Sequence, residues 1–209
     1  MQEPHFHRRH LPHIYLPERT YFVTFRLKGS LPVSKIKELK NRKEFTVIPK
    51  TKEEKYKQDS KFLLEYDKLL HANNRINYLK QPKIAAIVEY QLKKLDGKDY
   101  KLITYIVMPN HVHLVFNKLE NARSIDKIMQ EIKRMSAYYA NKELNKSGYF
   151  WQGESYDHIV RSEDELYKII KYVLKNPVKA GLVKFWHEWK YTYLAPEFSW
   201  SDCLQSDKT

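Results

Sequence analysis

Alternation of apolar and polar residues, or enrichment in β-branched residues, predicts four β-strands in this chain. They cover residues 19–28, 101–108, 111–116 and 155–161. In the first strand Tyr21, Val23 and Phe25 share one face, which is typical of a half-buried strand. The pair Pro109-Asn110 separates the second and third strands and suits a tight turn, so these two strands are predicted to form a β-hairpin.

Apolar residues that recur every three or four positions predict three amphipathic helices. They cover residues 81–95, 124–141 and 162–175. In the second helix the buried stripe is expected to run from Ile125 to Tyr139. Ser162 followed by Glu165 predicts a capping box at the start of the third helix. Pro177 predicts where that helix ends, because the residue before a proline is pushed out of the α region.

A basic segment, residues 33–75, lies between the first strand and the first of these helices. Its second half has apolar residues at helical spacing, and we interpret it as a solvated, charged helix with one apolar stripe. The stripe consists of Phe62, Leu63, Tyr66, Leu69 and Leu70. The first half has no clear period, which is compatible with a mobile arm.

The order of these elements predicts an α+β domain. We expect an antiparallel sheet of four or five strands with the helices on one face. The domain is predicted to cover residues 19–185, with 33–75 as a helical insertion. Residues 1–18 would form an N-terminal extension, and the C-terminal tail, 186–209, is expected to fold back onto the body.

The composition indicates a folded protein of a reducing compartment. Of its 209 residues 42% are hydrophobic, enough to bury a core without disulfides. Cys203 is the single cysteine, so no internal disulfide can form. The chain starts without an apolar signal segment, and no run approaches the roughly 20 apolar residues of a membrane span. We therefore expect a soluble, cytoplasmic protein without a membrane partner.

The charge favours a polyanionic partner. The formal net charge is +13, from 38 Lys and Arg residues against 25 Asp and Glu residues. A positive field attracts nucleic acid, although a basic protein without such a partner has the same composition. The 16 tyrosines and four tryptophans add rings on which unpaired bases could stack, but many of these rings must belong to the core.

Two histidines of the predicted hairpin are candidate metal ligands. His111 and His113 are two positions apart on a strand, so their side chains point to the same face, while Val112 and Leu114 face the other way. Two adjacent imidazoles can hold a metal ion. The alternative is a pair of exposed or hydrogen-bonded histidines, and the spacing alone does not decide between them.

Tyr172 is a candidate to meet a phosphate. It lies on the flank of its predicted helix, beside Lys168 and Lys175, and Asn176 follows one turn later on nearly the same face. The alternative is a tyrosine that shields the edge of the core.

Three segments together resemble the single-tyrosine HUH transposases, and most of all the REP-associated tyrosine transposases. The segments are TYFVTFRL at 20–27, IVMPNHVHLVF at 106–116 and YFWQGESYDHIVRSEDELYKIIKYVLKNPVKAGLV at 149–183. The last is the most specific, because WQ, DHIVR and NPVKAGLV occur in the order and spacing of that family. The resemblance covers about residues 20–30 and 80–185.

The resemblance implies a ferredoxin-like or RRM-like HUH endonuclease fold and a metal-dependent reaction on single-stranded DNA. It implies that His111 and His113 bind a divalent metal, Mg or Mn, and that Tyr172 is the nucleophile. Tyr172 would stay bonded to the 5′ phosphate and release a 3′ hydroxyl. Asn176 occupies the position of a further metal ligand, but asparagine departs from the Gln or Glu of some branches, so the third ligand stays open. The implied partner is single-stranded or hairpin DNA, bound by a monomer or a homodimer.

Several residues are candidates for DNA contact. They are Lys133, Arg134, Trp151, Arg161, Lys168, Lys175 and Lys179. The basic residues are expected to contact phosphates rather than to read bases. Trp151 could stack on a base or, equally, anchor its loop in the core.

Two other functions fit the same residues. The chain could be a non-catalytic nucleic-acid-binding protein on the same fold. It could also be a metal-dependent hydrolase that uses water, with Tyr172 in a structural role.

Overall fold

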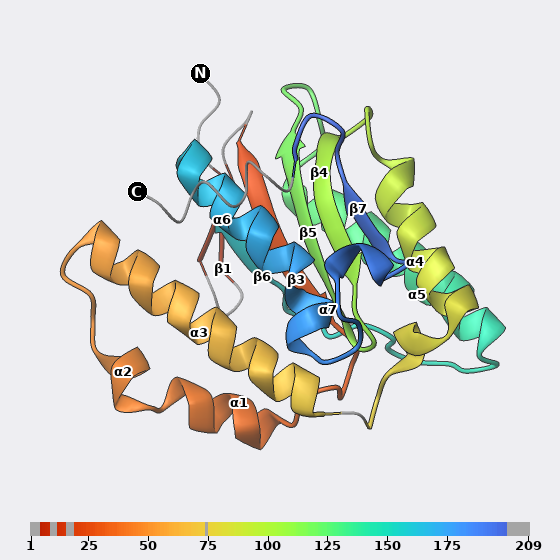
Figure 1. Cartoon of the computed structure of the whole chain (residues 1–209), viewed down its shortest axis with the longest axis horizontal. Helices are drawn as coiled ribbons and strands as arrows, with labels where there is room; N and C mark the ends of the chain where they lie inside the picture. Colours follow the sequence, from red (N-terminus) through yellow and green to blue (C-terminus); the bar gives the residue numbers. More distant parts are fainter. Residues whose placement is uncertain (1–4, 9–11, 16–18, 74, 200–209) are drawn as a thin grey trace.

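The computed structural model describes residues 5–8, 12–15, 19–73 and 75–199. Its centre is an open, five-stranded antiparallel sheet with the strand order β6-β3-β5-β4-β7 (Figure 1). The strands are β3 (Thr20–Arg26), β4 (Tyr100–Val107), β5 (His111–Lys118), β6 (Tyr156–Ile159) and β7 (Thr192–Leu194). The four predicted strands and the hairpin are confirmed. The fifth strand comes from the tail, which packs on β4 as expected.

The predicted N-terminal extension, residues 1–18, and the predicted C-terminal tail, residues 186–209, both contain short elements. A short hairpin, β1 (His5–Arg8) with β2 (Pro12–Tyr15), lies in the N-terminal part. The tail also contains the short 3₁₀ helix η2 (Trp186–Glu188). Trp200 and Cys203 lie outside the described residues.

Helices cover both faces of the sheet, so the expectation of one covered face is wrong. On one face lie α4 (Pro82–Lys94) and α5 (Ile125–Glu143), and on the other lie α3 (Lys52–Ala72) and α6 (Glu163–Leu174) (Figure 1). The reason is that the strands are apolar on both sides. Val112 and Leu114 of β5 belong to the first core, whereas Val115 of β5 and Phe22 of β3 belong to the second.

The basic segment 33–75 is helical in both halves. It forms α1 (Val33–Lys40), α2 (Lys43–Thr46) and α3. The first half therefore contains two helices where no period was evident. Phe45 of α2 packs on Phe62 of α3 with ring centroids 5.3 Å apart, and Gln58 donates to two backbone carbonyls of the α2 region at 2.9 Å. These tertiary contacts hold a stretch whose own pattern does not specify a helix.

Two details of the predicted helices differ. In α5 Tyr139 is 43% exposed, while Ser136 and Ala140 are buried, because the stripe turns around the helix towards the smaller residues. At the start of α6 Ser162 accepts from the backbone of Glu165 at 3.2 Å, but the Glu165 carboxylate accepts from the backbone of Arg161 at 2.6 Å. Only one half of the capping box is thus formed.

Short elements complete the chain. They are η1 (Tyr78–Lys80) before α4 and α7 (Asn176–Lys179) after α6. The helix α6 stops at Leu174, close to the predicted end. Asn176, however, begins the helical turn α7, so Pro177 does not push it out of the α region as expected. Among the described residues no helix is both long enough and apolar enough to cross a membrane.

Candidate active site

The two histidines of β5 lie side by side on the face covered by α3 and α6. Both side chains are fully buried, and their ring centroids are 4.8 Å apart. Val112 and Leu114 point into the opposite core, as the strand geometry predicts. The pair is therefore not exposed, which removes one of the two alternatives to a metal site.

Hydrogen bonds fix the orientation of both imidazoles. Asn110, in the hairpin turn, uses its amide N–H groups to donate to the carbonyls of Leu70 and Asn73, both at 2.9 Å. Its side-chain oxygen must then accept from Nδ1 of His111, at 2.7 Å. Nε2 of His111 consequently carries the lone pair. A metal-binding imidazole needs this arrangement, in which the other ring nitrogen donates to an oxygen.

His113 is held in a similar way from the neighbouring strand. Thr24 of β3 lies opposite His113 in the register, and its hydroxyl is hydrogen-bonded to Nδ1 of His113 at 2.7 Å. Nε2 of both histidines lacks a hydrogen-bond partner within the described part of the chain. The two free ring nitrogens therefore point into one buried space.

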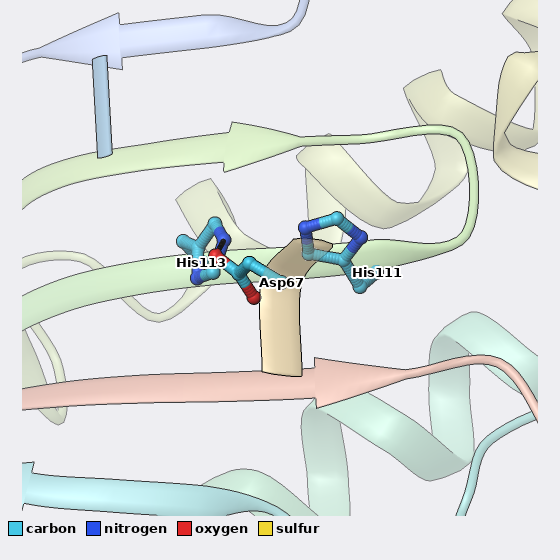
Figure 2. Close-up of side chains that lie close together, drawn as sticks. All are labelled: Asp67, His111 and His113. Carbon is cyan, nitrogen blue, oxygen red and sulfur yellow. Dashed lines mark ion pairs between the residues drawn. The ribbon is translucent and has the colours of Figure 1, made fainter. Parts of the chain in front are cut away.

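Asp67 of α3 faces the same space. Figure 2 shows its carboxyl group between the imidazoles of His111 and His113. One ligand atom from each of the three residues lies within 4.8 Å of the other two. Oδ2 of Asp67 is 3.1 Å from Nε2 of His113, and Oδ1 has no hydrogen-bond partner in the described residues. Three buried atoms that can accept but receive no hydrogen bond are the donor set that a cation satisfies.

Sequence reasoning missed Asp67 because the segment 33–75 was interpreted as a solvated helix. A signal was available. Asp67 lies four residues after Leu63 and three before Leu70, so it falls on the apolar stripe of α3. A lone carboxylate on the buried face of a helix needs a partner, since a buried charge is costly when unpaired.

Tyr172 of α6 reaches this group within the same chain. Its ring centroid is 5.6 Å from that of His113, and its hydroxyl donates to Oδ2 of Asp67. The tyrosine and the histidine pair thus converge on one buried place. The alternative interpretation, a tyrosine that only shields the edge of the core, does not account for this polar contact.

Asn176 lies at the edge of the same cluster and is buried. Its amide nitrogen donates to Oδ2 of Asp67 at 3.2 Å, and its amide oxygen is 2.7 Å from Nε2 of His71, at the end of α3. Its oxygen is therefore engaged by His71, whereas Oδ1 of Asp67 is free. His71 is a second residue of α3 that sequence reasoning did not connect with the site.

The buried groups shift one another's pKa values. Burial would raise the pKa of Asp67, but the neighbouring imidazoles of His113 and His111 and the Tyr172 hydroxyl together outweigh it and hold that pKa well below its usual range. Burial, reinforced by the neighbouring His113, lowers the pKa of His111, which keeps this imidazole neutral. Burial and the negative charge of Asp67 raise the pKa of Tyr172 well above its usual value. The phenol is therefore protonated at neutral pH unless positive charge is brought close to it.

One lysine is placed to supply such charge. Nζ of Lys179 lies 4.9 Å from the centroid of the Tyr172 ring, and burial lowers the pKa of Lys179. Lys168 and Lys175 also lie beside Tyr172 in the sequence. Lys168 is exposed and lines a cavity beside the Tyr172 ring, and Lys175 is half-buried.

Most of the remaining candidates for DNA contact lie on the opposite side of the sheet. Lys133 and Arg134 are on α5, across the sheet, and Nζ of Lys133 donates to the carbonyls of Gln152 and Gly153 at 3.1 Å. Arg161 is exposed just before α6. Trp151 is buried, and its indole N–H donates to Ser136 at 2.9 Å, as expected of a residue that anchors its loop in the core.

The chain is similar to known transposases. The sequence model of the family described as "Transposase IS200 like" matches residues 60–176, more than half of the chain. A REP-associated tyrosine transposase of Escherichia coli (strain K12) is 22% identical over 101 residues, which are 48% of this chain and 58% of that protein. A Haemophilus influenzae protein assigned to the same class is 24% identical over 102 residues, which are 44% of this chain and 58% of that protein.

The fold is also known from a solved structure. That structure, of a REP-associated tyrosine transposase bound to a REP hairpin, is similar with a TM-score of 0.57 and 18% identity. The similarity covers 92% of this chain and 82% of the other. The family match begins at residue 60, inside α3, so Asp67 lies in the matched region and α1 and α2 lie before it.

Proposed function

The chain belongs to the IS200-like transposase family, and from this premise we propose that it is a metal-dependent endonuclease and strand transferase acting on single-stranded DNA. Tyr172 is the proposed nucleophile, and the reaction passes through a covalent 5′-phosphotyrosine. The proposed substrate is DNA with hairpin-forming repeats. The curated relatives contribute only about half of their length to the similarity, so substrate and reaction are inferred from the site.

One observation carries this proposal. A phenol from α6, two imidazoles from β5 and a carboxylate from α3 converge in one buried cluster of one chain. A protein that merely binds nucleic acid has no use for three unsatisfied buried ligand atoms beside a tyrosine hydroxyl. Phosphodiester cleavage needs this combination of a nucleophile and groups that position and neutralise a phosphate.

The cluster fits a divalent metal ion. His111, His113 and Asp67 would hold it through two ring nitrogens and one carboxylate oxygen, the atoms that lack a hydrogen bond. Asp67 is a better-placed third ligand than Asn176, whose oxygen is engaged by His71. Imidazole suits zinc-like ions and carboxylate suits Mg or Mn, and the family resemblance favours Mg or Mn. Such an ion would supply positive charge that polarises and orients the scissile phosphate.

The residues of the chain account for the rest of the chemistry. The Tyr172 oxygen attacks phosphorus, an O–P bond forms and the bond from phosphorus to the 3′ oxygen breaks. The hydrogen bond to Asp67 orients the phenol, the phenolic proton passes to solvent, and the departing 3′ oxygen takes up a proton from solvent. Lys179 stabilises the phenolate that develops. The phosphotyrosine conserves the ester, so another 3′ hydroxyl can attack it and join the strands without ATP.

A covalent-adduct assay tests this proposal. The protein is incubated with labelled single-stranded hairpin DNA and Mn²⁺ and then analysed on a denaturing gel. We expect a protein-DNA adduct that disappears in Tyr172→Phe and persists in Tyr167→Phe, a matched change on the same helix. Binding without cleavage would instead support the non-catalytic alternative. Cleavage that survives Tyr172→Phe would support the hydrolase that uses water.

A further inference from the structure

A cavity of about 170 Å³ adjoins the Tyr172 ring on the side of α3 and β6. Its walls come from β3, α3, β6 and α6. They are mainly aromatic and aliphatic, formed by Phe22, Tyr56, Leu63, Tyr156, Ile169 and Tyr172. It is smaller than the roughly 300–1,000 Å³ of typical small-molecule sites, so it suits a single ring system rather than a larger ligand.

The cavity combines flat apolar walls with a few polar groups. Phe22 and Tyr156 meet edge to face with centroids 6.2 Å apart, and Tyr56 lies 6.1 Å from His158. Nε2 of His158 is hydrogen-bonded to Oε1 of Glu165 at 2.8 Å. Ser60 and the exposed Lys168 also line the cavity. Aromatic surface next to a lysine is the chemistry that binds a base and its phosphate together.

We propose that this cavity holds one unpaired nucleobase of the DNA strand, from a nucleotide next to the scissile phosphate. The inference rests on the proposed function, because it assumes that the phosphate meets the Tyr172 hydroxyl. The Tyr172 ring is a wall of the cavity, while its hydroxyl reaches Asp67 on the metal side. A base linked to that phosphate must lie within a few ångströms of the Tyr172 hydroxyl. A base that leaves its stack in the DNA gains stacking energy only where aromatic side chains are present.

A second cavity lies too far from Tyr172 to bind a base next to the scissile phosphate. It lies between α4 and α5, on the opposite face of the sheet, and is lined by residues such as Lys83, Tyr90 and Lys142. It shares no residue with the site around Tyr172. Its exposed Tyr90 supplies a control for the loss of an aromatic ring at a distance from the proposed chemistry.

The test is a set of strands that each lack one base, at successive positions on both sides of the cleaved bond. Adduct formation is measured with Mn²⁺, and binding is measured separately with Tyr172→Phe, which keeps the ring but cannot react. We expect one abasic position next to the cleavage site to weaken both by about tenfold. In Tyr56→Ala the intact strand should fall to the level of the abasic strand, and removing the base should have no further effect. Tyr56→Phe and Tyr90→Ala should retain the full difference.

The outcomes separate this inference from the proposed function. If no strand gives an adduct with the unmodified protein, the proposed function fails, and the binding series with Tyr172→Phe still tests the cavity. If adducts form equally with every abasic strand, the cavity holds no base. If one position matters but its effect is unchanged in Tyr56→Ala, that base binds elsewhere. Either of the last two results overturns the inference and leaves the proposed reaction intact.

Discussion

At the scale of single residues, the site depends on which polar atoms lack a hydrogen bond as much as on which residue types are present. Asn110 and Thr24 engage one nitrogen of each imidazole and leave the other free. Asp67 is similarly held through one oxygen by Tyr172 and Asn176, while its other oxygen has no partner in the described chain. The supporting hydrogen bonds therefore orient the three ligands before any ion arrives, which lowers the entropic cost of binding it.

Asp67→Asn should weaken Mn²⁺ binding by at least about tenfold, because it removes the single carboxylate of the ligand group. The affinity is measured by calorimetric titration of Mn²⁺ into the protein. Asp59 is the other aspartate of α3 and is paired with Lys55 at the surface, so Asp59→Asn should leave the affinity unchanged. Equal affinities in the two variants would show that Asp67 is not a ligand.

Because His111 is buried as a neutral imidazole, we predict how the stability of the metal-free protein, with a chelator present, varies with pH. Its folded pKa is lowered, mainly by burial, so below the unfolded value of about 6.5 the unfolded chain binds a proton that the folded one does not. The contribution of His111 to the free energy of unfolding should thus be fully present above that pH. It should decrease as the pH drops below it. The limiting slope for one such group is about 1.4 kcal/mol per pH unit.

Denaturant unfolding between pH 7.5 and 5 would measure this slope. His71, whose pKa burial also lowers, contributes in the same direction. The slope should be shallower in His111→Asn and unchanged in His187→Asn, which alters an exposed histidine. A slope that is the same in all three proteins would contradict the burial of a neutral His111.

At the scale of elements, α3 joins the site from outside the sheet. It packs on α1 and α2, and polar contacts connect it to the strands. Arg26 of β3 donates to the Tyr66 hydroxyl at 2.6 Å, and Asn110 donates to the carbonyl of Leu70. An ion shared between Asp67 on α3 and the histidines on β5 would connect the two elements in addition to these side-chain hydrogen bonds.

Mn²⁺ should therefore slow amide hydrogen exchange in α3 more than in α5, which contributes no ligand. A ligand at about one hundred times its Kd stabilises the bound form by about 2.7 kcal/mol, which sets the upper limit of the protection. Exchange is followed by mass spectrometry with and without the ion. The difference should vanish in Asp67→Asn. Protection that is uniform over the chain would show that the ion does not fasten α3 in particular.

At the scale of the whole molecule, the sheet separates two kinds of basic surface. Lys168 and Lys179 accompany the candidate active site, whereas Lys133 and Arg134 belong to the helix across the sheet. The net charge of +13 attracts DNA to the molecule as a whole, but the strand that enters the site meets the first group.

Lys168→Ala should consequently weaken binding of a single-stranded probe and reduce the slope of log K against log salt by about 0.7, the value for one phosphate contact. Arg134→Ala should leave the slope unchanged, although the sequence had suggested both residues. Fluorescence anisotropy over a range of salt concentrations, with Tyr172→Phe as the common background, gives both slopes. Equal changes in the two variants would mean that the strand extends over both faces.

Much of the fold and part of the site followed from local patterns. Strand alternation placed His111 and His113 on one face, and helical spacing placed Tyr172 on the flank of α6 with Asn176 one turn later. The family resemblance then connected these distant segments. These predictions succeeded because the direction of a side chain depends on the geometry of its own strand or helix.

What the sequence by itself determined is therefore the four strands β3 to β6, the helices α3 to α6, the paired imidazoles and the candidate nucleophile. Only the tertiary structure decided that α3 returns to the sheet, that Asp67 meets a tyrosine 105 positions away, and that Lys179 rather than Lys168 lies over its ring. It also decided that Trp151 is buried and that a cavity opens beside Tyr172. Local periodicity fixes which way a side chain points, but packing of the whole core fixes what it meets there.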